Sequence, residues 1–187
     1  MLMSDTAIFA IGNMLSKIVL FLLMPFYTTI LSASEYGISD TINNFVELLL
    51  PISTLCISEA VFRFLIDNND DSVSILKKGL FINVLGCLVT TLIALLVNVY
   101  IGFYWMGYLL LLLWTQVIRQ FLGYSLRGLG KSKAFAITGV LATLFLVFFN
   151  LIFLKVLHFK IEGYLLSIVF SNVITIIFSS FILLKSN

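Results

Sequence analysis

The chain has 187 residues, of which 61% are hydrophobic and only 11% are charged, and its mean hydropathy is +1.14. A soluble domain is close to half apolar, and a small domain leaves a large share of its surface exposed. This composition therefore excludes a soluble globular domain and indicates an integral membrane protein. The net charge of +2 gives no reason to expect a nucleic-acid partner.

Continuous apolar runs of twenty or more residues predict helices that cross roughly 30 Å of membrane hydrocarbon, whereas a membrane barrel alternates apolar and polar residues. The runs of this length are 7–31, 38–64, 76–101, 104–126, 134–157 and 161–184. We therefore expect an all-α polytopic membrane protein, with residues 1–187 forming a single six-helix transmembrane bundle. Pro25 and Pro51 each remove a backbone donor from their run, and we expect both to act as hinges.

The first two runs carry charged side chains where a membrane span usually has none. An ionisable group at the bilayer centre costs about 2.5–3.5 kcal/mol, so such groups usually face a partner or a wet cavity. Lys17 in the first run and Glu47 in the second each lie roughly 15 Å from a membrane face at 1.5 Å per residue. We expect the two to pair or to share one cavity. The alternative is a buried ion pair that only fixes packing.

Further polar residues of the second run recur at helical spacing. One stripe faces the bundle or a water-filled cleft, because it would be costly against lipid; its members are Asp40, Asn43, Asn44 and Glu47. Near the other end of the run, Glu59 and Arg63 stand four residues apart. This spacing predicts an ion pair within the helix.

The fourth run ends in a polar face made by Gln116, Arg119 and Gln120, which are spaced by three and four residues. Two orientations of Arg119 remain open. Its guanidinium can extend along the helix to the cytoplasmic surface, or it can point inward with the two glutamines.

Basic residues give the orientation in the membrane. Those in or beside the turns that follow the second and fourth runs are Arg63, Lys77, Lys78, Arg127, Lys131 and Lys133. Since positively charged loops stay in the cytoplasm, both termini are predicted to be cytoplasmic. His158 is the only histidine, so we expect neither a histidine-based metal cluster nor a Ser-His triad. No motif of an intramembrane enzyme is present, so we expect no catalytic residue, metal or cofactor.

Four short motifs carry a family resemblance. The segment from Pro25 to Gly37 is similar to the P-x-x-T-x-x-L-x-x-x-E-Y-G pattern of polysaccharide-export flippases, and Ala60–Phe64 looks like their A-x-x-R-F/Y ending of helix two. Arg127–Lys131 resembles their R-G-x-x-K turn, and Glu162–Tyr164 resembles their polar-glycine turn before helix six. In order and spacing the chain resembles the flippases of the multidrug/oligosaccharidyl-lipid/polysaccharide exporter superfamily.

The resemblance implies a transporter in the bacterial inner (cytoplasmic) membrane. It would flip a polyprenyl-diphosphate-linked oligosaccharide to the outer leaflet by alternating access through a central charged cavity. The residues that we expect to line this cavity are Lys17, Asp40, Glu47, Arg63 and Arg119. The implied partners are the lipid-linked oligosaccharide and membrane lipid, and a proton or sodium is compatible as coupling ion.

Members of that superfamily carry two six-helix lobes with the cavity between them, and this chain resembles the N-terminal lobe. We therefore expect a second lobe, or a second copy of the chain, to complete the transporter. Two other functions stay open. One is a multidrug/cation antiporter of the same superfamily, in which Asp40 and Glu47 take up protons or sodium. The other is a membrane scaffold that transports nothing.

Overall fold

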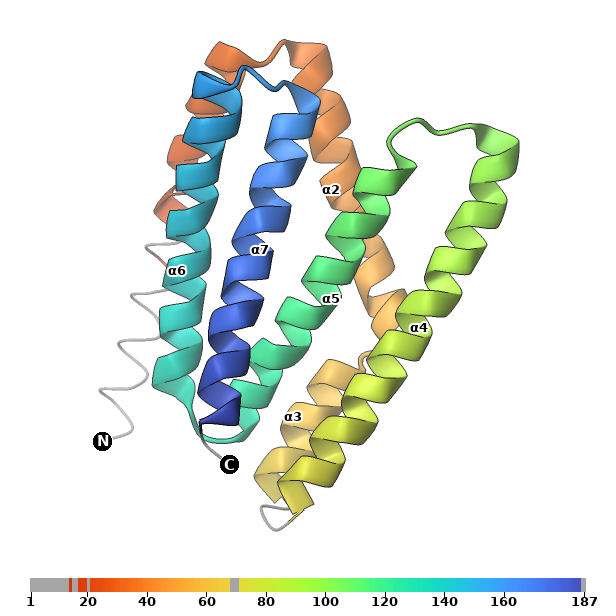
Figure 1. Cartoon of the computed structure of the whole chain (residues 1–187), viewed down its shortest axis with the longest axis vertical. Coiled ribbons are helices and arrows are strands. Elements are labelled where there is room, and N and C mark those ends of the chain that lie inside the picture. Colours follow the sequence, from red (N-terminus) through yellow and green to blue (C-terminus); the bar gives the residue numbers. More distant parts are fainter. Residues whose placement is uncertain (1–13, 15–16, 20, 68–70, 186–187) are drawn as a thin grey trace. The chain divides into compact units, whose positions relative to one another are not determined.

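A computed structural model describes residues 14, 17–19, 21–67 and 71–185 (Figure 1). Within these ranges the chain is helical apart from short turns and contains no strand, so the prediction of an all-α protein is confirmed. Its contacts define two compact units, the first made of residues 1–41 and 131–187 and the second of residues 42–130. Helix α2 (Ala33–Thr54) begins in the first unit and ends in the second.

Long apolar helices dominate both units. Those with the length and composition of a membrane span are α4 (Ser72–Ile101), α5 (Met106–Gly128), α6 (Ser132–Asn150) with its extension η2 (Leu151–Val156), and α7 (Ile161–Leu184). α2 and α3 (Ile57–Asp67) pass the same test together as a bent pair, which gives up to five spans in the described part of the chain. The expected span 7–31 lies partly outside the described residues, and its residues 21–30 are helical. The protein is therefore a multi-pass membrane protein.

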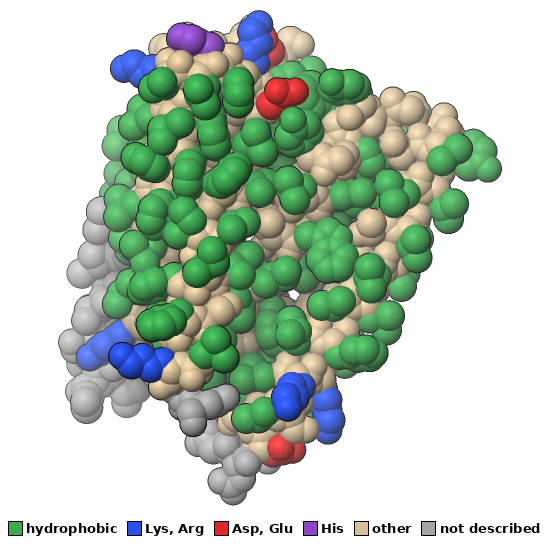
Figure 2. Space-filling view, viewed as in Figure 1, with side chains coloured by type: hydrophobic (Ala, Val, Ile, Leu, Met, Phe, Trp, Pro, Cys, Tyr) green, Lys and Arg blue, Asp and Glu red, His purple; other side chains and the backbone are tan. Residues whose placement is uncertain are grey.

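In helix α4, buried and exposed residue types are distributed in the opposite way to those of a soluble protein. Its buried residues are small or polar and recur along one face: Gly79, Asn83, Cys87 and Thr90. Its outward side chains are large and apolar, and Val99 is 81% exposed. Figure 2 shows the same distribution on the visible face, where hydrophobic side chains cover the helices and charged ones gather at the ends. Small buried residues allow close helix contacts, and the apolar exterior suits a lipid environment.

The second unit is held together by close packing of α3 against α4 and α5. Val61, Leu65 and Phe121 form one buried apolar cluster in this unit. A Cβ atom at Gly79 would collide with Val61, so the absence of a side chain there lets α4 approach α3. The indole Nε1 of Trp114 donates to Thr91 Oγ1 at 3.0 Å and joins α5 to α4.

The second expected span is broken. α2 ends at Thr54, α3 begins at Ile57, and the two helices are bent by 53°. The residues between them, Leu55 and Cys56, have left-handed φ angles of 48° and 55°, a conformation that costs about 1–2 kcal/mol for residues other than glycine. Pro51 lies within α2, four residues before the break. Whether Pro25 or Pro51 acts as a hinge stays a prediction.

The first unit is built on the α6–α7 hairpin. The hydroxyl of Ser171 donates to the carbonyl of Ala142 at 2.6 Å, which ties the two helices together near their middle. The turn between the helices is tight, because a Cβ atom at Gly163 would lie 2.9 Å from Cβ of Phe159. α6 continues into the π-helix η2, so an irregular segment leads from α6 into this turn.

Candidate functional site

The residues predicted to line a cavity are divided between the two units. Lys17 and Asp40 belong to the first unit, whereas Glu47, Arg63 and Arg119 belong to the second. The side chains of Lys17 and Glu47 are both exposed within the described part of the chain. Their expected pairing joins the two units and therefore stays a prediction.

On α2, the polar stripe keeps its helical spacing. Asn43 Nδ2 donates weakly to Glu47 Oε1 at 3.4 Å, one turn further along the helix. Asp40 lies near Tyr36, one turn before it, and its charge acts on that phenol. The stripe is thus a row of neighbouring polar groups, as predicted from the spacing, but its role in a cavity stays a prediction.

Arg119 points inward. Its Nε atom is enclosed and has no hydrogen-bond partner within the described ranges. Gln116, one turn earlier on α5, is only 8% exposed, so this face of the helix is covered. The alternative in which the guanidinium reaches the cytoplasmic surface is therefore disfavoured. Burying a charged group is costly without an opposite charge, and among the described residues Nε has no acceptor.

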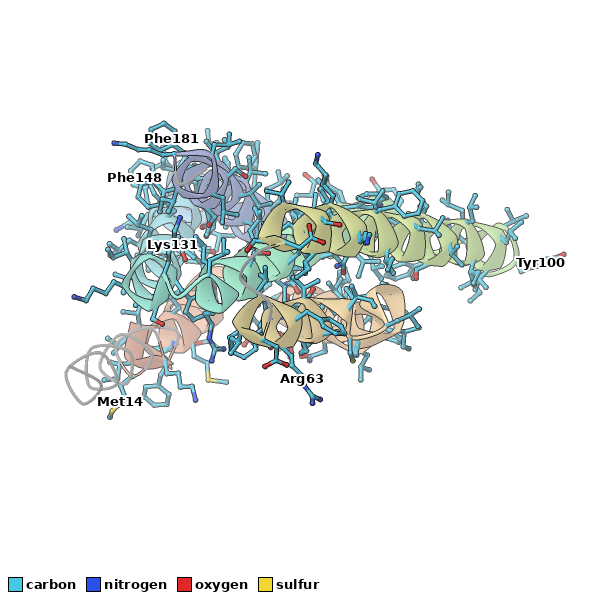
Figure 3. The ribbon with its side chains drawn as sticks, turned by 90° about the horizontal axis from the view of Figure 1, so that it is seen from below. Met14, Arg63, Tyr100, Lys131, Phe148 and Phe181 are labelled. Carbon is cyan, nitrogen blue, oxygen red and sulfur yellow. The ribbon has the colours of Figure 1, made fainter. Side chains whose placement is uncertain are left out.

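Glu59 and Arg63 do not form the expected ion pair, and that prediction was wrong. Arg63 Nε lies 4.0 Å from Asp67 Oδ2, one turn further along α3, and its side chain extends away from the helix (Figure 3). Glu59 instead accepts a hydrogen bond from Gln120 Nε2 of α5 at 3.3 Å. Spacing by four residues fits both possible partners of Arg63, so the sequence alone did not separate them.

The contact between Glu59 and α5 is a polar cluster that the sequence did not predict. The hydroxyl of Tyr124 lies beside both Glu59 and Gln120 and interacts with each. The amide oxygen of Gln120 is enclosed without a hydrogen-bond donor in the described part of the chain. Gln120 and Tyr124 stand four residues apart on one face of α5, and this spacing was the available signal.

A second polar cluster closes the turn between the first two spans. Ser32 and Glu35 cap α2 reciprocally: the Ser32 amide and hydroxyl each donate to Glu35 Oε2 at 2.9 Å, and the Glu35 amide donates back at 3.3 Å. Lys160, at the start of α7, lies 2.7 Å from the other carboxylate oxygen of Glu35. Lys160 and then Ser32 stabilise the charged carboxylate and lower the pKa of Glu35 to about 2.

Three tyrosines of the first unit pack against one another. The ring of Tyr27 lies 4.9 Å from that of Tyr164 in an edge-to-face arrangement and stacks 5.9 Å from Tyr36. Tyr36 and Tyr164 belong to the E-Y-G and E-G-Y motifs, and Glu35 belongs to the first of these. The two motifs therefore meet in the first unit, where they join the turn before α2 to the turn before α7.

The other two motifs meet in the second unit. Arg127 of R-G-x-x-K lies over the ring of Phe62 of A-x-x-R-F, at 5.0 Å from its centroid. A Cβ atom at Gly128 would lie 2.8 Å from Cβ of Leu65, so the glycine lets the end of α5 press against α3. These motif residues hold helices together, whereas the charged residues on the spans remain the candidates for contact with a substrate.

Long apolar helices, small buried faces and charged groups within the spans define a multi-pass helical membrane protein. The family model of the polysaccharide biosynthesis proteins matches residues 2–186. The chain belongs to this family, which agrees with its resemblance to polysaccharide exporters. Comparison with curated proteins and with solved structures found no match.

Proposed function

We propose that the protein flips a polyprenyl-diphosphate-linked oligosaccharide from the cytoplasmic to the outer leaflet of the bacterial cytoplasmic membrane. Membership of the polysaccharide biosynthesis family supports a place in this process. The single observation that favours an anionic substrate is Arg119, whose enclosed Nε lacks an acceptor among the described residues. Guanidinium groups bind phosphate and carboxylate oxygens through paired hydrogen bonds, so a diphosphate or an acidic sugar suits this position.

Around Arg119 we assign the remaining charged residues of the spans to the same cavity. Lys17 and Arg63 add positive charge for the diphosphate, while Asp40 and Glu47 supply acceptors for sugar hydroxyls or a site for a coupling proton or sodium ion. The opposite wall comes from a second six-helix lobe or a second copy of the chain. The cycle is alternating access, without a cofactor and without covalent chemistry.

The proposal is tested in a strain that lacks the chromosomal gene and expresses it from a plasmid. Arg119→Gln removes the charge, and we expect at least a tenfold loss of surface polysaccharide together with accumulation of lipid-linked units at the inner leaflet. Arg119→Lys keeps the charge but loses the paired geometry, so partial activity is expected. Lys185→Gln, which removes an exposed charge just after α7, is the matched control.

Protein abundance is measured for each variant by immunoblotting of the membrane fraction. Normal polysaccharide in the Arg119→Gln strain, at normal abundance, would contradict the proposed role of this guanidinium. Normal polysaccharide after deletion of the whole gene would contradict the flippase itself.

A further inference from the structure

The break between α2 and α3 interrupts a span at residues that do not favour it. Leu55 and Cys56 both adopt left-handed φ angles, and neither is a glycine. Both side chains are exposed in the described part of the chain, so burial of these side chains does not explain the conformation. Irregular backbone at membrane depth is tolerated only where protein or water covers it. The residue types at the break therefore do not explain why the helix is interrupted there.

The two sides of the break are packed very differently. α3 is fixed to its neighbours by Val61 against Gly79, by Leu65 against Gly128, and by the hydrogen bond from Gln120 to Glu59. α3, α4 and α5 each contact the other two, and we call them the three-helix group.

The second-unit part of α2, residues 42–54, has no comparable packing against the three-helix group. Phe45, Leu48 and Ile52 are 54–67% exposed along it. One close contact with the group lies beside the break, where the Ser53 carbonyl lies against Gly86 of α4 and leaves no room for a Cβ atom. Ile42 and Val46 of the same segment are buried, at 2% and 0% exposed. One half of the span is thus fixed by close helix contacts, whereas the other half, which we call the arm, buries only part of its apolar side chains and lacks such contacts with the three-helix group.

Local hydrogen bonds add to the bend at the end of the arm. The hydroxyls of Ser53 and Thr54 donate back to the carbonyls of Leu49 and Leu50 at 2.8 and 3.0 Å. Such back-bonding competes with the regular backbone pattern and bends helices. Pro51, in the same turn, supplies no backbone donor. The last turn of α2 therefore does not favour one continuous helix.

We propose that Leu55 and Cys56 form a hinge, and that α2 pivots about it against the three-helix group between the bent form and a straighter form. In the straighter form both residues return to helical φ angles and Ser53 leaves Gly86. The pivot carries Asn43 and Glu47, which lie on the arm. It regulates the cavity only if the proposed function holds, because only then does this polar stripe line a substrate path.

The motion can be measured without substrate, by pulsed electron paramagnetic resonance on the full chain in lipid nanodiscs. Nitroxide labels are placed on cysteines at Phe45 of the arm and Leu96 of α4, after replacement of Cys56 by serine and of Cys87 by alanine. Phe45 lies about ten residues, or roughly 15 Å, from the hinge, so pivoting through the observed bend of 53° moves the label by about 13 Å. Labels at Ile66 and Leu96 report on the three-helix group alone and serve as the control pair.

Two variants push the equilibrium in opposite directions. Leu55→Gly with Cys56→Gly removes the cost of the left-handed angles and favours the bent form. Leu55→Ala with Cys56→Ala has the best helix propensity and favours the straighter form. We expect two populations between positions 45 and 96, with a population ratio that differs by roughly tenfold or more between the two variants, and an unchanged control distance.

One narrow distance between positions 45 and 96, the same in the starting protein and in both variants, would overturn the hinge. If either variant fails to fold, the number of distance populations between positions 45 and 96 in the starting protein decides: two populations support the hinge, and one narrow distance overturns it. The flippase proposal can fail separately, since it depends on polysaccharide export and not on these distances. If the distances shift as expected while deletion of the gene leaves export intact, the hinge stands and the proposed function does not.

Discussion

The guanidinium carbon of Arg127 lies 5.0 Å from the centroid of the Phe62 ring and 5.9 Å from that of Tyr124. Phe62 is on α3, and both other residues are on α5. A cation over an aromatic face is stabilised by the ring quadrupole, more strongly when water is excluded. This contact joins two motifs that lie more than sixty residues apart in the chain, and it explains their joint occurrence through packing of α5 on α3.

Replacing Phe62 by leucine should destabilise the second unit. The change removes the cation–π contact and the ring contact with Tyr124, and we expect a loss of about 0.5–2 kcal/mol in the free energy of unfolding. Thermal unfolding in detergent micelles measures it. Phe64→Leu, two residues away on the exposed face of α3, is the control and should change little. Equal melting temperatures for the two variants would contradict a stabilising role for the Arg127–Phe62 contact.

Glycine positions on α5 separate close packing from backbone freedom. At Gly128 a Cβ atom would press on Leu65, whereas at Gly107 of the same helix it would meet nothing within 4 Å. Gly128→Ala should therefore cost about 1–3 kcal/mol through overpacking. Gly107→Ala should stabilise by about 0.4–1 kcal/mol, because alanine lowers the entropy of the unfolded chain. Chemical denaturation in micelles compares them, and a stabilised Gly128→Ala variant would show that α5 ends away from α3.

The length of apolar runs predicted most of the helices well. The runs 76–101, 104–126 and 161–184 correspond to α4, α5 and α7. The reason is that a helix that crosses the hydrocarbon needs an apolar run of a definite length. The break at Leu55 and Cys56 was not predicted. Neither is a turn-forming residue, and the contact that accompanies the break, Ser53 against Gly86, joins segments that are distant in the sequence.

The sequence predicted the candidate site only where the spacing of residues within one helix determines which side chains are neighbours. The polar stripe on α2 follows from helical periodicity. The orientation of Arg119 needed the neighbouring helices, since a long side chain can reach either way from the same backbone position. The partners of Glu59 lie on α5, 61 residues away for Gln120. Spacing along one helix favoured Arg63 instead, which pairs with Asp67.

A double-mutant cycle tests the assignment of Glu59. With Glu59→Ala and Gln120→Ala, we expect a coupling of about 0.5–1.5 kcal/mol in the free energy of unfolding, the usual value of one hydrogen bond. The matched cycle combines Glu59→Ala with Arg63→Ala and should give additive changes, because Arg63 contacts Asp67. A larger coupling to Arg63 than to Gln120 would restore the intrahelical pair.

The Glu35–Lys160 ion pair should make stability depend on pH in the acid range. Lys160 and Ser32 lower the pKa of Glu35 from its ordinary 4.5 to about 2 in the folded protein. The unfolded chain then binds the proton first as the pH falls, so the contribution is complete above about pH 4.5 and is lost as the pH falls towards 2. Melting temperatures measured at pH 6, 4 and 3 should fall, and Glu35→Gln should flatten the slope between pH 4.5 and 3. Glu162→Gln, a carboxylate two residues from Lys160 in the same turn, is the control and should keep the slope. An unchanged slope in Glu35→Gln would mean that other carboxylates set the acid response.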